Sequence, residues 1–193
     1  MTVRGRGGEL PRARGVVLFT TLVLLALLTM VGISGALVVR MEQGMARNAH
    51  DSMLAFQAAE SALRDAEDWL AANATDPAAV FPAPGQGRHG APAWGTAPGW
   101  RQDDVWQRGS AEATALGGVA MPPRYVIEWL TSYPDAAPPD GSGGTVDAFR
   151  ITALGYGGTE RAQVVLQTTF GRLRGVVGGS PGRLSWMEFD SVP

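Results

Sequence analysis

The sequence predicts an α+β protein, in which one long N-terminal helix packs on a small antiparallel β-sheet. Residues 16–39 carry no charge, and residues 40–73 place apolar side chains three and four positions apart without a proline. The last third of the chain instead alternates apolar and polar residues, as half-buried strands do. A striped helix and a one-sided sheet can bury their apolar surfaces against each other, which predicts two packed layers.

The first half of the predicted helix is suited to a membrane. Val16 to Val39 are 24 uncharged residues, which as a helix span roughly 36 Å, enough to cross a bilayer. Arginines precede this segment, so the positive-inside tendency places the N-terminus in the cytoplasm and everything beyond Arg40 in the periplasm. The apolar segment then runs without a break into the next helical pattern.

The second half of the helix carries an apolar stripe. Charged residues such as Arg47, Asp51 and Asp65 are expected on the wet faces. Asn73 and Asp76-Pro77 should end the helix, because proline cannot continue it. The predicted packing face consists of Met45, Ala49, Phe56, Ala59, Leu63, Ala66 and Leu70.

The rest of the chain divides into a loop and a sheet. Residues 74–122 are rich in Pro, Gly and Ala and predict a long loop, with a helical turn over 103–115 and tryptophans that pin it to the domain. Residues 123–193 predict the sheet. Its expected strands are 125–130, 149–154 and 162–170, with an edge strand over 184–189, and 155–160 form the hairpin between the second and third.

Composition excludes several function classes. The chain has no cysteine, hence no disulfide or thiol nucleophile. Lysine is absent too, which removes Schiff-base chemistry and the P-loop lysine. The net charge is −2 although the first 15 residues are basic, so the body is acidic and a poor partner for nucleic acid.

No motif makes a convincing catalytic, cofactor or metal site. Residues 85–90 fit G-x-G-x-x-G, but prolines flank them where a strand and a helix should lie. Residues 178–182 fit G-x-S-x-G, but Pro181 lacks the N–H that an oxyanion hole needs after Ser180. His50 and His89 lack zinc-ligand spacing and are expected to be two exposed polar residues. The following carboxylates are expected to be solvated or to lack a ligand ladder for calcium: Glu60, Glu67, Asp68, Asp135 and Asp140. We therefore predict no enzyme and no cofactor.

Stretches near both ends of the chain carry a family resemblance. Arg14-Gly15 before the apolar helix resembles the signal of type IV prepilins. Residues 47–51 and 54–64 resemble the N-terminal signature of PilX-type minor pilins. Residues 123–129, 149–158 and 162–168 resemble that family's C-terminal strands. The resemblance implies a pilin-like fold.

The resemblance also implies how the N-terminus is processed. A prepilin peptidase would remove residues 1–15 as a leader, cut after Gly15 and methylate the new N-terminus at Val16. Major pilins carry a glutamate at the fifth mature position, which pairs with the amine of the neighbouring subunit. That position is Thr20 here. A carboxylate in lipid is costly unless it is paired, so its absence suggests a subunit at or near the pilus tip.

The function implied is structural. The protein would join other minor pilins and the major pilin in a priming or tip complex that initiates a type IV pilus, with twitching motility and adhesion as indirect results. It would rest in inner-membrane lipid before entering the fibre. Two alternatives stay open: a minor pseudopilin of type II secretion, and a single-pass periplasmic anchor or binding module unrelated to pili.

Overall fold

The structure is a computed structural model that describes residues 13–73, 76–81, 86–90, 98–101, 104–114, 116–135, 143–175 and 181–189. It divides into two units, Met1–Arg47 and Asn48–Pro193. The first contains only the beginning of the long helix among its described residues, and the second contains the rest of that helix and the sheet. Each unit is considered by itself below.

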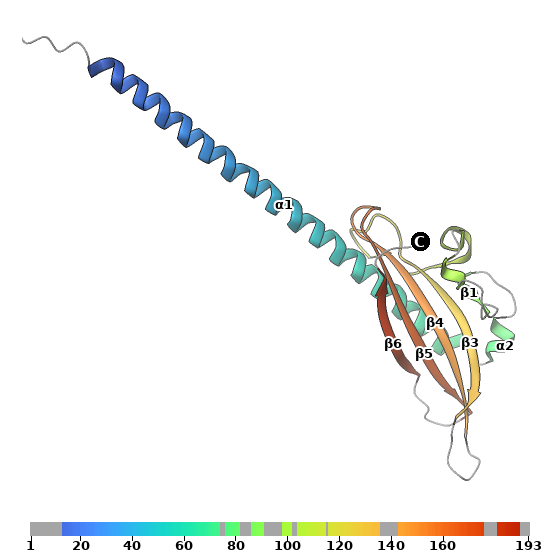
Figure 1. Ribbon diagram of the computed structural model, residues 1–193. Helices are drawn as coiled ribbons and strands as arrows, with labels where there is room; N and C mark the ends of the chain where they lie inside the picture. The colour runs from blue at the N-terminus through green and yellow to red at the C-terminus, as the bar shows by residue number, and fades with distance from the viewer. Residues whose placement is uncertain are drawn as a thin grey trace, which may run out of the picture. The chain divides into compact units, whose positions relative to one another are not determined.

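One helix, α1 (Ala13–Asn73), runs through both predicted helical segments (Figure 1). It begins three residues before Val16 and includes all three glycines that interrupt the pattern, Gly32, Gly35 and Gly44. The predicted continuous helix is confirmed. Its end at Asn73 agrees with the stop expected ahead of Asp76-Pro77.

Four long strands form a meander. They are β3 (Arg124–Pro134), β4 (Thr145–Tyr156), β5 (Gln163–Arg174) and β6 (Gly182–Phe189). Neighbours in the order β3-β4-β5-β6 pair antiparallel, with register shifts at Trp129/Thr131 and at Thr169/Phe170. All four predicted strands are present, and each is longer than predicted.

The predicted α+β fold, a long helix packed on a sheet whose long strands are antiparallel, is confirmed, and the sheet also contains two short strands that the sequence did not predict. A two-residue strand, β1 (Arg88–His89), pairs parallel with β3, and β2 (Ala111–Glu112) pairs antiparallel with it, so the sheet has six strands and is mixed. Gly87 turns the chain onto β3 with φ of 76°, and its carbonyl accepts a hydrogen bond from the Ile127 N–H. Strands of two residues show no period in the sequence, which is why they were missed.

The segment over 74–122 contains more structure than a loop. It holds α2 (Pro77–Val80), a 3₁₀-helix η1 (Gly99–Arg101) and a π-helix η2 (Val105–Gly109). The helical turn predicted over 103–115 therefore ends at Gly109, and β2 follows it. Trp100 and Trp106 are buried, whereas Trp94 lies outside the described residues.

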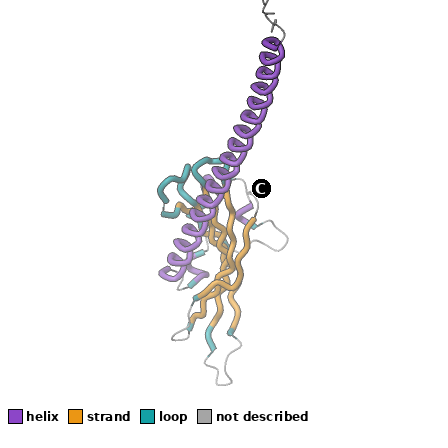
Figure 2. The backbone as a smooth tube through the Cα atoms, turned by 90° about the vertical axis from the view of Figure 1, so that its left-hand side faces the viewer, coloured by secondary structure: helices purple, strands orange, loops and turns teal. Residues whose placement is uncertain are grey.

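The sheet has apolar contacts on both faces. On one face, the second half of α1 packs on side chains that alternate along the strands, among them Ile127, Ile151 and Leu166. On the other face, Trp100, Val105 and Trp106 pack on the intervening residues Val126, Leu154 and Val165. Within this unit the helix lies along the strands (Figure 2). The unit therefore has three layers where the sequence predicted two.

Candidate assembly surfaces on the long helix

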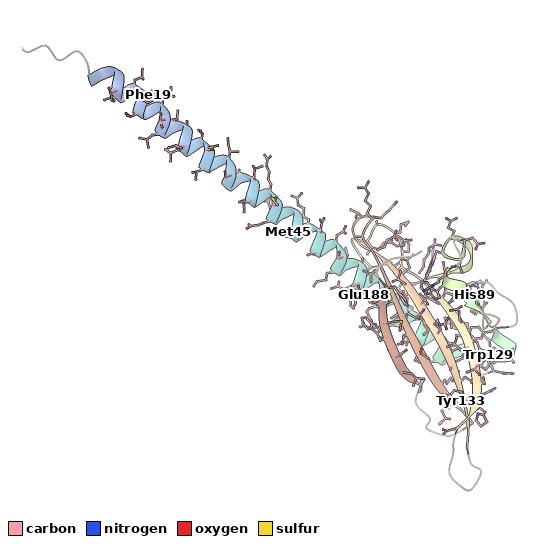
Figure 3. The ribbon with its side chains drawn as sticks, viewed as in Figure 1. Phe19, Met45, His89, Trp129, Tyr133 and Glu188 are labelled. Atoms are coloured by element: carbon pink, nitrogen blue, oxygen red, sulfur yellow. The ribbon has the colours of Figure 1, made fainter. Side chains whose placement is uncertain are left out.

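The first half of α1 exposes apolar side chains around its whole circumference. Leu18, Leu25 and Val31 are 71%, 64% and 71% exposed, and Phe19 and Met45 project from the helix in Figure 3. By length and composition, α1 could cross a membrane, and none of its most apolar stretch is buried in the protein. Such a surface is unstable in water and needs lipid or other apolar helices around it.

Gly15, Val16 and Thr20 lie in the first turns of α1 and are exposed. The Thr20 hydroxyl donates to the Val17 carbonyl at 3.0 Å. Because a threonine can satisfy its hydroxyl within its own helix, it needs no partner in lipid, unlike a carboxylate. Thr20 therefore needs no charged neighbour at this position.

The predicted packing face divides in two. Ala59, Leu63, Ala66 and Leu70 are completely buried against the sheet, and Phe56 is partly buried. Met45 and Ala49 are exposed. Ala55, Ala58 and Ala62, which the spacing did not select, are also fully buried. Complete burial against the sheet therefore begins at Ala55, and Met45 and Ala49 stay exposed before it.

Glycines allow the helix to approach the sheet closely. A Cβ on Gly155 in β4 would collide with the Ala55 carbonyl oxygen and the Ala59 nitrogen, and one on Gly157 would collide with Asp51. Small residues on both sides thus bring the two backbones together, as the row of buried alanines also shows. This contact fixes the helix at the end of β4 that leads into the next turn.

Asp51 is bound to that turn. Its carboxylate accepts hydrogen bonds from the Gly158 N–H, from the Thr159 N–H at 3.2 Å and from the Thr159 hydroxyl at 2.6 Å. The Thr159 hydroxyl, followed by the backbone donors, lowers the pKa of Asp51 below its ordinary value against the opposing effect of desolvation. Asp51 was expected on a wet face; it is partly buried beside an open hollow, and its carboxylate is bound to the turn, which the sequence did not predict. Likewise Asp65 accepts a hydrogen bond from the Thr114 N–H at 2.6 Å.

Glu60 and Glu67 were expected to be solvated, and this is wrong. Arg183 of β6 contacts Glu67 at 2.5 Å and Glu60 at 3.4 Å. The Trp186 indole N–H donates to Glu60 at 2.9 Å, and its ring meets Phe56 edge-on at 6.1 Å. The two carboxylates sit seven positions apart on one helix face, so they act together as the attachment of the outermost strand.

A buried ion pair lies on the opposite face of the sheet. Glu128 is 1% exposed and accepts from the Gly99 N–H at 2.7 Å, while Arg150 lies 3.3 Å from its other oxygen. Gly99 begins η1, so this carboxylate ties the tryptophan-containing segment to β3. A buried charge is stable only when it is paired, as it is here.

The candidate residues for chemistry do not converge. His50 is exposed, whereas His89 is partly buried in β1 rather than exposed as expected. Within the described parts of the chain, no group of three or more acidic or histidine side chains could hold a metal ion. Asp140, Gly85, Gly178 and Ser180 lie outside the described residues. The described side chains thus provide packing and docking groups and no convergent reactive set.

The architecture is that of a pilin-like protein, in which one long helix is apolar in its first half and carries a sheet on its second. A family model described as "PilX N-terminal" matches residues 14–64, and one described as "Type IV pilus assembly protein PilX C-term" matches residues 46–172. The chain belongs to the PilX family of type IV pilus minor pilins. A search of the curated proteins found no match, and neither did a search of the solved structures.

Proposed function

We propose that this protein joins other minor pilins and the major pilin in a priming or tip complex that initiates assembly of a type IV pilus. The observation that carries the proposal is the exposed apolar half of α1 on a chain of the PilX family. Lipid satisfies this surface before assembly, and neighbouring helices satisfy it afterwards. The role is structural and needs no reactive group.

In this proposal the chain is made as a precursor. Residues 1–15 are the leader, a prepilin peptidase cuts between Gly15 and Val16, residues 16–39 cross the inner membrane, and residues 40–73 lead into the periplasmic sheet region over 123–193. The boundary is supported by Arg14-Gly15 and by the absence of charge from Val16 onward. Cutting before the apolar segment explains why that segment is retained.

The decisive experiment is N-terminal sequencing of the protein from sheared, purified pili. We expect Val16 at the N-terminus, carrying an N-methyl group. In cells that lack the prepilin peptidase, the protein should stay about 15 residues longer, as removal of the leader predicts. An anchor unrelated to pili would be absent from the sheared fraction and would keep its size when the peptidase is removed.

Position 20 tests placement near the tip. A subunit with no pilin above it needs no carboxylate there, and an unpaired carboxylate in lipid is costly. We expect Thr20→Glu to insert into the membrane but to change the amount of protein in sheared pili, with Thr20→Ser as the control. Quantitative blotting measures both. An unchanged amount of Thr20→Glu in sheared pili would contradict the idea that residue 20 determines where the subunit is placed in the pilus.

A further inference from the structure

We propose that Asp51 and the Gly158–Thr159 turn form a latch, which sets how many turns of α1 the folded domain holds. In the closed state, which the structure shows, Asp51 holds the helix to the turn. In the open state, residues 48–54 separate from the turn while the buried face from Ala55 to Leu70 stays packed.

Burial along α1 sets the limits of the latch. From Asn48 to Leu54 every side chain is exposed except those of Asp51 and Leu54, which are partly buried, and the completely buried face begins at Ala55. Two helical turns therefore depend on a single carboxylate for their side-chain hydrogen bonds to the sheet region. Beyond them, Ala59 and Leu63 are held by buried apolar contacts that are far more costly to break.

The turn does not need Asp51 for its own shape. The Gly157 N–H donates to the Ala162 carbonyl at 2.8 Å, and the Ala162 N–H donates to the Thr159 carbonyl at 3.2 Å. The Gly158 and Thr159 N–H groups are therefore held in position to receive the carboxylate whether or not it is present. Because these donors are preformed, the latch can close again without rebuilding the turn.

Water can replace the hydrogen bonds of the latch. A hollow of about 690 Å³ lies beside Asp51, and its lining includes Asn48, Ser52, Thr159 and Glu160. Hydrogen bonds that solvent can reach exchange with water at little net cost, unlike bonds in a dry core. The latch is therefore the part of the contact between helix and sheet that is easiest to open.

Opening would release about seven residues, or roughly 10 Å of helix at 1.5 Å per residue. The biological use of the latch rests on the proposed function. In a fibre, the released turns, with Ala49 and Met53 exposed, would lengthen the surface of α1 that neighbouring helices can contact. The latch itself is a property of the isolated chain, so it can be tested without pili.

Hydrogen exchange of the full chain in detergent micelles, read by mass spectrometry, is the first test. In Asp51→Ala, residues 48–54 and the Gly158 and Thr159 amides should exchange severalfold faster than in the unaltered protein. Residues 59–70, β4 and β5 should keep their rates. Thr159→Val, which keeps both backbone donors, should show a smaller increase at the same places. Asp68→Ala is the matched control, since Asp68 is exposed on the same helix.

Two results would overturn the latch. Unchanged exchange at residues 48–54 would show that Asp51 does not hold them. Faster exchange across the whole sheet, or failure of Asp51→Ala to fold while Asp68→Ala folds, would show that Asp51 belongs to the global fold.

A locked variant tests use in assembly. Because the chain has no cysteine, Asp51→Cys with Thr159→Cys can form only one intramolecular disulfide. We expect the oxidised form to lose most of its incorporation into pili and the reduced form to regain it. Equal incorporation of both forms would refute the role in assembly. If neither the variant nor the unaltered protein enters pili, the proposed function itself fails, and the exchange result still decides the latch.

Discussion

The two halves of α1 share one backbone conformation but have opposite surroundings. Residues 16–39 expose their leucines and valines on every side, whereas residues 55–70 bury one face completely. Helix propensity alone does not stabilise a helix in water, so each half needs a different environment. The described residues leave the first half uncovered, whereas the sheet covers one face of the second half. A substitution should therefore act on stability or on assembly according to the half in which it falls.

Truncating one leucine in each half should give the largest contrast. Leu63 is fully buried, so Leu63→Ala should lower the free energy of unfolding of the domain by about 2–5 kcal/mol. Leu25 is 64% exposed, and Leu25→Ala should leave it unchanged. Urea unfolding of the full chain in detergent, followed by tryptophan fluorescence, measures both. Equal losses for the two variants would show that the halves are not independent.

A charge in the first half should have the converse effect. Leu25→Asp places a carboxylate near the middle of residues 16–39, which costs about 3 kcal/mol in lipid. We expect less of the variant in the membrane fraction and no change in urea unfolding of the domain. Gln57→Asp, on the exposed side of the second half, is the control and should stay in the membrane. Normal retention of Leu25→Asp would count against a membrane role for the first half.

The large features of the fold could be predicted because each has a period. The helix ends at Asn73, and β5 places Val164, Leu166 and Phe170 on the face that packs against it, at the spacing of a strand. The burial of Val165 on the other face was not predicted, because it depends on the tryptophan-containing segment. The short pairings of β1 and β2 could not be predicted, since two residues make no pattern. The β1 pairing depends on the turn at Gly87, whose positive φ brings the chain beside β3. The sequence does not show that the chain passes β3 at this point.

The polar contacts of the helix were missed for a different reason. Asp51, Glu60 and Glu67 look like solvated helix charges in the sequence, because their partners lie more than 100 residues further along. A signal was available in Gly155-Tyr-Gly-Gly-Thr159, since three glycines around a tyrosine indicate a close backbone approach. No such signal marks Arg183, whose role follows only from the position of β6.

The attachment of β6 should have a smaller and salt-dependent effect. Arg183 is partly exposed, so Arg183→Met should lower the free energy of unfolding by no more than about 1 kcal/mol. Added salt should lower the free energy of unfolding of the unaltered protein toward that of the variant. Ionic screening weakens the attraction between Arg183 and its two glutamates, which the variant lacks. Urea unfolding at low and high salt measures this, with exposed Arg161→Met as the control. If Arg183→Met lowers the free energy of unfolding equally at low and high salt, the effect comes from lost packing and not from lost charge.

The smallest expected effect is the pH dependence of the latch. The Thr159 hydroxyl and the turn N–H groups lower the pKa of Asp51 in the folded protein, whereas in the unfolded chain it should be about 3.9. Since the folded pKa is the lower one, the latch contributes its full stability above the unfolded pKa and loses it as pH falls through the folded pKa. Asn in place of Asp51 cannot titrate. The difference in free energy of unfolding between the unaltered protein and Asp51→Asn should therefore be constant near neutral pH and shrink below about pH 4.

His50, Glu160 and Arg161 are the other titratable or charged groups around Asp51. They are present in both proteins, so the difference cancels their own titration to first order. Thr159→Val should make the loss smaller and complete it at a higher pH, because it removes the largest cause of the lowered folded pKa while the unfolded pKa stays the same. A loss of unchanged size in Thr159→Val would mean that the carboxylate is not held by this hydroxyl. A different contact would then have to hold α1 to the sheet region at the point where the second half of the helix begins.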